Sequence, residues 1–197
     1  MALRTLAAST QDTAPGSAGE VLSLCLDAKA RALAAERDLF VGIAQWADRH
    51  TTGALMPDVH GTFGLIDEET ASAWMDRYGM PGADTFLDLA GPGAPEVSDF
   101  AITELSTALG RTRQSGRLLV GDVVEAKHRL PQTWARLVAG TVEPWRVRRI
   151  AQTTRTLTME AAGFVDSHVA HVAHSVGLPT IERLVAEAAA RVDPETV

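Results

Sequence analysis

The sequence predicts an all-α protein, because helix-forming residues dominate and short Gly and Pro breaks separate amphipathic segments. Hydrophobic residues make up 46 % of the 197-residue chain and aromatic residues only 5 %, which favours a folded helical protein over a disordered one. The length corresponds to one or two domains of roughly 150 residues each. We divide the chain into a disordered tail at 1–19, a long helix at 20–50, a Gly/Pro-rich connector at 51–95 and a helical domain at 96–197.

The N-terminal helix is expected over about residues 20–49. Apolar side chains recur there at helical spacing, namely Leu22, Leu26, Ala30, Leu33, Phe40, Ala44 and Ala47. Arg37 interrupts this stripe and no heptad pattern is sustained, so the stripe favours a helix packed on the core. The alternative is a coiled-coil seam with another chain. Cys25 lies beside Leu22 and Leu26, which predicts a buried and inert thiol.

The connector at 51–95 is interrupted throughout by Gly and Pro, and its length indicates an excursion with a role of its own. One helix is expected near 68–78, with Asp67 as its N-cap. A metal or acid–base site built from the sparse set His50, Asp58 and His60 is the less favoured interpretation of those residues.

Six closely spaced helices are expected after residue 96, at 97–109, 113–130, 131–139, 144–155, 159–175 and 179–191. Pro131 and Pro144 begin two of them, because proline fits the first helical position. Thr112 and Thr158 are the expected N-caps of two others. Short breaks between amphipathic helices are typical of an all-α domain.

The segment at 102–130 has the layout of a helix-turn-helix, with Gly110 able to adopt positive φ in the turn. At 100° per residue, the second helix turns Leu119, Val123, Ala126 and Leu130 inward. The opposite face, expected to meet solvent, carries Arg113, Gln114, Arg117 and Gly121. Two positions depart from the usual motif, because Ser106 stands where alanine is common and Gly116 where a β-branched residue is common.

Basic residues concentrate between residues 111 and 155, which hold 10 basic and 3 acidic side chains, whereas residues 1–110 hold 6 and 16. The net charge of −7 excludes polyanion binding by bulk charge but allows a local basic platform. Two helices, at 113–130 and 144–155, would form a cationic ridge that binds double-stranded DNA. Arg113, Gln114 and Arg117 would contact base edges or phosphates. The phosphates alone would be contacted by Arg111, Arg146, Arg148, Arg149 and Arg155.

The segment HRLPQTWARLVAGTVEPWRVRRIAQTTRTL at 128–157 and the closing ARVDPE at 190–195 resemble the actinobacterial family called domain of unknown function 222, or the 13E12-repeat family. In that family the domain commonly precedes an HNH nuclease domain. The resemblance therefore implies a non-catalytic DNA-binding or targeting module of an HNH-endonuclease-type protein. The clustered His and Asn of an HNH motif are not present here, so any catalytic residue would lie outside this chain.

The competing hypothesis is a protein-interaction or dimerisation module, a possible homodimer, whose arginines pair with acidic residues of the same chain. The sequence contains no catalytic motif, and we expect no metal and no cofactor. His168, His171 and His174 fan over one side of their helix, which predicts surface histidines rather than converging metal ligands. No apolar run has the length of a bilayer span or a signal peptide, so a cytoplasmic protein without membrane contact is expected.

Overall fold

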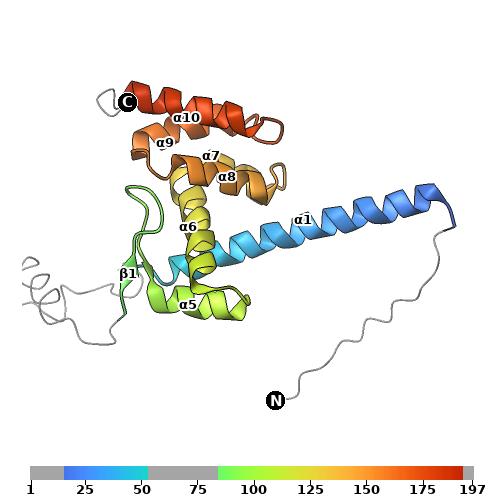
Figure 1. Cartoon of the computed structure of the whole chain (residues 1–197), viewed down its shortest axis with the longest axis horizontal. Coiled ribbons are helices and arrows are strands. Elements are labelled where there is room, and N and C mark those ends of the chain that lie inside the picture. The colour runs from blue at the N-terminus through green and yellow to red at the C-terminus, as the bar shows by residue number, and fades with distance from the viewer. Residues whose placement is uncertain (1–15, 53–83, 193–197) are drawn as a thin grey trace, which may run out of the picture.

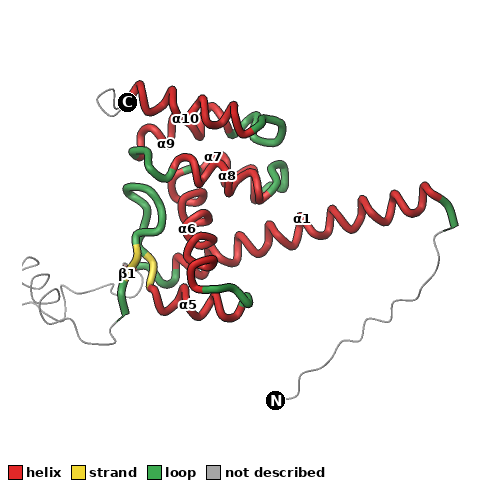
Figure 2. The backbone as a smooth tube through the Cα atoms, viewed as in Figure 1, coloured by secondary structure: helices red, strands yellow, loops and turns green. Residues whose placement is uncertain are grey.

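A computed structural model describes residues 16–52 and 84–192 of the chain. In this part seven helices and one two-stranded sheet are present, which confirms the all-α prediction (Figures 1 and 2). The elements are α1 (Ala18–Asp48), β1 (Phe86–Leu87), β2 (Val97–Ser98), α5 (Asp99–Ala108), α6 (Arg113–Arg129), α7 (Pro131–Val138), α8 (Pro144–Thr154), α9 (Met159–Val169) and α10 (Leu178–Val192).

Helix α6 is the central helix of the domain. It contacts α1, α5, α7, α8 and α9, and it crosses the middle of the molecule in Figure 1. Ten of its 17 residues are buried, among them the predicted inner residues Leu119, Val123 and Ala126. A helix surrounded in this way builds the core, so little of its length is left for contact with another molecule.

A short antiparallel sheet ties the end of α1 to the start of α5. Strand β1 pairs with β2 in the register Phe86 to Ser98 and Leu87 to Val97. The Ser98 amide also donates to the His50 carbonyl at 2.9 Å, which joins the sheet to the residues after α1. These strands are not predictable from the sequence, because two residues are too few to show an alternating pattern.

The N-terminus of α7 is capped by a side chain that is distant in sequence. Its N-cap residue, Leu130, offers no side-chain acceptor. Instead, the buried carboxylate of Asp166 on α9 accepts from the backbone amides of Gln132 and Thr133 at 2.8 and 2.9 Å. The Thr133 hydroxyl donates to the same carboxylate at 2.6 Å. Free amides at a helix start are thus satisfied by tertiary packing.

Most predicted helix boundaries agree with the structure within two residues, and α9 is the exception. It ends at Val169 rather than at residue 175, because the following residues form a run of turns with bonds such as Val172 amide to Val169 carbonyl. The predicted tail at 1–15 and the predicted helix near 68–78 lie outside the described residues. None of the described helices combines the length and apolar character needed to cross a membrane.

Helix α1 has two halves with different environments. Near its C-terminus Phe40, Ile43, Ala44 and Ala47 are buried in the core. In contrast, every residue from 16 to 32 is exposed, and Figure 2 shows this half extending away from the rest of the protein. The prediction of a core-packed helix is therefore right for the second half and wrong for the first. The prediction of a buried Cys25 is also wrong, because this thiol lies on the exposed half.

Candidate nucleic-acid interface and the exposed helix

The turn between α5 and α6 contains the predicted glycine with positive φ. Gly110 adopts a φ of +63°, and its amide donates to the Thr107 carbonyl at 3.0 Å. The next amide, of Arg111, reaches back to the Ser106 carbonyl at 2.8 Å. Thr112 then caps α6 by accepting from the Ser115 amide. The local sequence therefore dictates this turn, since glycine and threonine each meet a specific backbone requirement.

The two departures from the usual helix-turn-helix pattern compensate for each other. The Ser106 hydroxyl donates to the Ile102 carbonyl at 2.6 Å within α5. A Cβ atom added at Gly116 would lie 2.7 Å from the Ser106 Cβ and still closer to its hydroxyl oxygen. Glycine on α6 thus makes room for serine on α5, and the two helices approach closely at this crossing.

The expected solvent face of α6 is only partly exposed. Gly121 is buried, and a Cβ atom there would lie 2.5 Å from the Leu89 carbonyl oxygen. The side chain of Arg117 is 31 % exposed and faces a carboxylate. The prediction of an outward face is therefore wrong for Gly121, which the segment before β2 covers. It is only partly right for Arg117, because the start of α5 provides a carboxylate partner for its partly exposed side chain. Arg113 and Gln114, in the first turn, remain exposed.

Asp99 binds two of the predicted DNA-contacting arginines. It is the first residue of α5, and its side chain is only 6 % exposed. Arg113 forms an ion pair with one carboxylate oxygen, and Arg117 donates to the other at 2.9 Å. Burial raises the pKa of Asp99, but the hydrogen bonds and charges of these two arginines outweigh burial and leave the pKa below its ordinary value of 3.8. Asp99 is therefore a strongly bound anion at the positive end of a helix.

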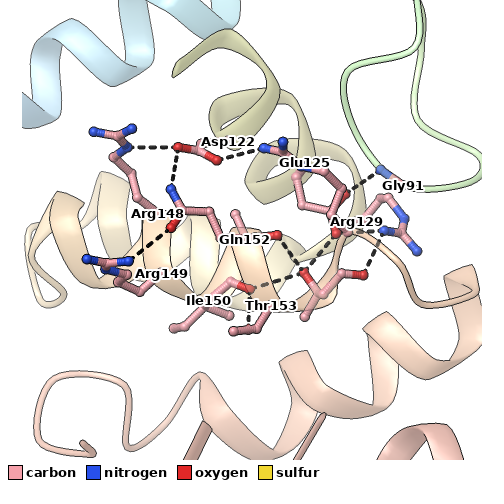
Figure 3. A network of polar contacts seen from close by, with 12 residues as sticks. Gly91, Asp122, Glu125, Arg129, Arg148, Arg149, Ile150, Gln152 and Thr153 are labelled. Carbon is pink, nitrogen blue, oxygen red and sulfur yellow. Dashed lines mark hydrogen bonds and ion pairs between the residues drawn. The ribbon is translucent and has the colours of Figure 1, made fainter. Parts of the chain in front are cut away.

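Asp122 binds two more of the arginines, as Figure 3 shows for Arg148. This carboxylate lies on α6 and is buried. Arg148 donates to it at 2.9 Å, Arg155 at 2.6 Å and the Gln152 amide at 3.0 Å. One aspartate thus holds three donors from α8 and the residue after it, which fixes α8 against α6.

Arg146 is also engaged within the chain. Its guanidinium donates to the carbonyls of Ala173 and Val176 at 3.3 and 2.8 Å and contacts Glu143 at 3.4 Å. It also stacks over the Trp145 ring at 4.6 Å. These contacts join the start of α8 to the turns that follow α9.

The remaining candidates are the most accessible ones. Arg111, Gln114 and Arg149 are exposed. Arg111 donates to the Ser115 hydroxyl at 3.1 Å and Arg149 to the Gln152 side chain at 3.4 Å. Within residues 16–52 and 84–192 neither arginine has a carboxylate partner.

The paired arginines do not form one ridge. Arg113 and Arg117 lie about 140–180° around α6 from Asp122, at 100° per residue, so the Asp99 and Asp122 clusters occupy different sides of this helix. Five of the seven candidate arginines contact carboxylates of the same chain, in the described part of the protein. Asp99 and Asp122 were not predicted as partners from the sequence, although each is an acidic residue in or beside the basic helices. The role of the eight candidates as DNA contacts stays a prediction.

The histidines lie where the sequence predicts them. His168, His171 and His174 are exposed, and His168 contacts the Phe164 carbonyl through Nδ1 at 2.8 Å. His50 makes the same kind of contact with the Trp46 carbonyl. Among the described residues no group of three or more His, Cys, Asp or Glu side chains is arranged to hold a metal ion.

The exposed half of α1 carries the same apolar stripe as its buried half. At 100° per residue, Leu22 and Leu26 fall on the face that also carries Phe40, Ile43 and Ala47. Leu22 and Leu26 are 61 % and 59 % exposed, whereas Phe40 is 2 % exposed. The opposite face of this half carries the charged residues Glu20, Asp27 and Arg31 together with Leu24, which is also exposed. We call Leu22, Cys25 and Leu26 the exposed stripe.

Comparisons with protein-family models, curated proteins and solved structures found no match for this chain.

Proposed function

We propose that this chain is a protein-interaction module that binds another polypeptide through the exposed stripe of α1. The main observation in support is that this stripe is continuous with the buried face of the same helix. The face that packs on the core at Phe40 and Ile43 continues for several turns beyond the domain. The domain anchors the helix, and the extending half presents apolar side chains to a partner.

Physical considerations support a partner for this segment. An isolated helix of about 15 residues is marginally stable in water, and most helices gain their stability by burying an apolar face. Each leucine that a partner buries contributes about 1.5–3 kcal/mol. Burial of Leu22 and Leu26 by another apolar surface would therefore contribute substantial binding free energy.

The arrangement of the arginines also favours this proposal over DNA binding. A guanidinium that pairs with a buried carboxylate has already exchanged water for a charged partner, so its attraction to a phosphate is reduced. Asp99 and Asp122 engage Arg113, Arg117, Arg148 and Arg155 in this way.

Site-specific photo-cross-linking in living cells tests the proposal. A photoreactive phenylalanine analogue replaces Leu26 in one variant and Leu24 in a matched control. Leu24 is 58 % exposed but lies on the opposite side of α1. We expect discrete cross-linked species from position 26 and none from position 24. Equal labelling at both positions, or none at position 26, contradicts the proposal.

DNA binding is the second candidate function, and it matches what the resemblance to the 13E12-repeat family implies. The observation that favours it is the exposure of Arg111, Gln114 and Arg149 without a carboxylate partner in the described residues. These residues leave a smaller set of contacts than the sequence predicts.

Fluorescence anisotropy with a labelled duplex at several salt concentrations tests the DNA hypothesis. A DNA-binding module loses affinity steeply with salt, and Arg111→Ala reduces the salt slope by about one. Arg183→Ala, an exposed arginine of α10 outside the basic segment, is the control and leaves the slope unchanged. If the anisotropy does not depend on salt or on Arg111, the DNA hypothesis is rejected.

A further inference from the structure

We propose that the partner of the exposed stripe is a second copy of this chain, whose α1 packs antiparallel against it over residues 18–30. This inference rests on the proposed function, because it names the occupant of the same surface. In the arrangement that the geometry favours, Leu22 of each copy lies opposite Leu26 of the other, and the two domains lie at opposite ends of the pair.

The position of the domain excludes a parallel pair. Phe40, Ile43 and Ala47 pack on the domain with the same face that carries Leu22 and Leu26. A second helix that ran parallel in register would place its own domain where the first domain already lies. An antiparallel helix avoids this clash, because its domain lies beyond the N-terminus of the first helix.

The domain also limits how far the two helices overlap. Lys29 lies 3.9 Å from Glu143, in the turn before α8, so the domain begins to border α1 at this residue. The freely accessible stripe is therefore the part before Lys29. Leu22 and Leu26 are four residues apart, and an antiparallel pair about a twofold axis between them sets each leucine against the other. The stripe is complementary to itself in this register.

The charge of Lys29 also favours an antiparallel pair. At 100° per residue, Lys29 falls within about 20° of Leu22 and therefore lies on the face that carries the exposed stripe. A parallel pair in register would set the two Lys29 ammonium groups against each other, which is unfavourable. In the antiparallel register Lys29 lies opposite Gly19 of the other copy instead. Because Gly19 has no side chain, the lysine stem has room to extend towards solvent.

The overlap is short, so the association is weak. Two turns of helix from each copy form an interface at the small and transient end of the known range. A reversible dimer is therefore expected at high protein concentration, with the monomer prevailing on dilution.

Sedimentation equilibrium over a wide concentration range tests the inference on the whole chain. We expect the average mass of the wild type to rise from monomer towards dimer. Leu26→Glu should weaken association by roughly tenfold per copy and hence about 100-fold per dimer. Leu24→Glu, on the other side of the helix, should leave association unchanged. A wild type that stays monomeric up to its solubility limit overturns the inference, as does an equal effect of both substitutions.

Disulfide trapping tests the direction of the two helices. In a Cys25→Ser background, Ala18→Cys and Ala32→Cys are prepared as separate proteins, and both positions are exposed. In the antiparallel register position 18 of one copy lies opposite residue 30 of the other, and position 32 is two residues further along, within about 40° of position 18 around the helix. Mixing and oxidation should therefore give the mixed dimer, linked between position 18 of one copy and position 32 of the other, because a parallel pair in register would keep these positions about 20 Å apart. A preference for the two symmetric dimers would show a parallel pair and contradict the inference.

The two proposals fail in distinguishable ways. If the chain stays monomeric but position 26 cross-links to a protein of another mass in cells, the second copy is wrong and the interaction function stands. If position 26 yields no cross-linked species and the chain stays monomeric, both are wrong.

Discussion

Two buried carboxylates fix the orientation of several arginine side chains in this protein. Asp99 and Asp122 are almost fully buried, and each binds two arginines from neighbouring elements. A buried carboxylate needs such donors, because an unpaired charge in the interior is costly. Burial of the acid therefore draws the guanidinium inward, and the cluster of basic residues in the sequence becomes part of the helix contacts.

Asp99→Asn should lower the free energy of unfolding by about 2 kcal/mol at neutral pH, because it removes the charge that Arg113 and Arg117 bind. The pKa of Asp99 is lowered in the folded protein, so the stabilisation is complete above about pH 5 and is lost as the pH falls through the folded-state pKa. Urea unfolding of wild type and variant at several pH values measures this difference.

Glu104→Gln is the control for this experiment, because Glu104 is an exposed carboxylate on the same helix. It should change the unfolding free energy by less than about 0.5 kcal/mol. If the difference in unfolding free energy between wild type and Asp99→Asn stays constant down to strongly acidic pH, the stabilisation does not come from the charge of Asp99.

Among the helices, α5 and α6 approach closely because a serine meets a glycine. Ser106 and Gly116 occupy positions where the usual motif has alanine and a β-branched residue, and each departure makes sense only with the other. Sequence patterns treat the two positions separately, whereas packing couples them.

Gly116→Ala should destabilise the protein by about 1–3 kcal/mol through overpacking, although alanine is the better helix former. In a Ser106→Gly background the same substitution should cost clearly less, since its Cβ no longer meets a side chain. A double-mutant cycle from thermal or urea unfolding measures the coupling. Additive effects of the two substitutions would show that the close contact at this crossing is not important.

Across the protein as a whole, one buried ion pair joins segments that are far apart in sequence. Arg129 binds Glu125 at 2.6 Å and donates to the carbonyls of Thr154 and Leu157 at 3.2 and 2.5 Å. Glu125 also accepts from the Gly91 amide at 2.8 Å, as Figure 3 shows. The pair thus connects α6 with the segment before β2 and with the junction between α8 and α9.

Arg129→Met should destabilise the protein by about 3–5 kcal/mol, because it leaves the buried Glu125 without its charge partner. Adding Glu125→Leu should recover part of this loss, since no uncompensated charge then remains. Arg191→Met is the matched control: Arg191 and Glu187 form an ion pair of the same spacing at the surface. It should cost less than about 1 kcal/mol. Urea unfolding distinguishes these outcomes, and equal losses at Arg129 and Arg191 would contradict the argument.

Local structure follows from the sequence alone, as the helices, the Gly110 turn, the Thr112 cap and the apolar stripe of α1 show. Caps, turns and helical periodicity depend on residues a few positions apart, so they can be predicted without knowledge of the fold. Tertiary packing, in contrast, buries α6, brings arginines into ion pairs with Asp99 and Asp122 and leaves half of α1 exposed. Arg117 and Arg155 find their carboxylates 18 and 33 residues away, and burial depends on how the helices pack together. Such long-range contacts leave no periodic signal in the sequence. The sequence therefore locates the basic residues along the chain, but it does not show how much of their charge faces solvent.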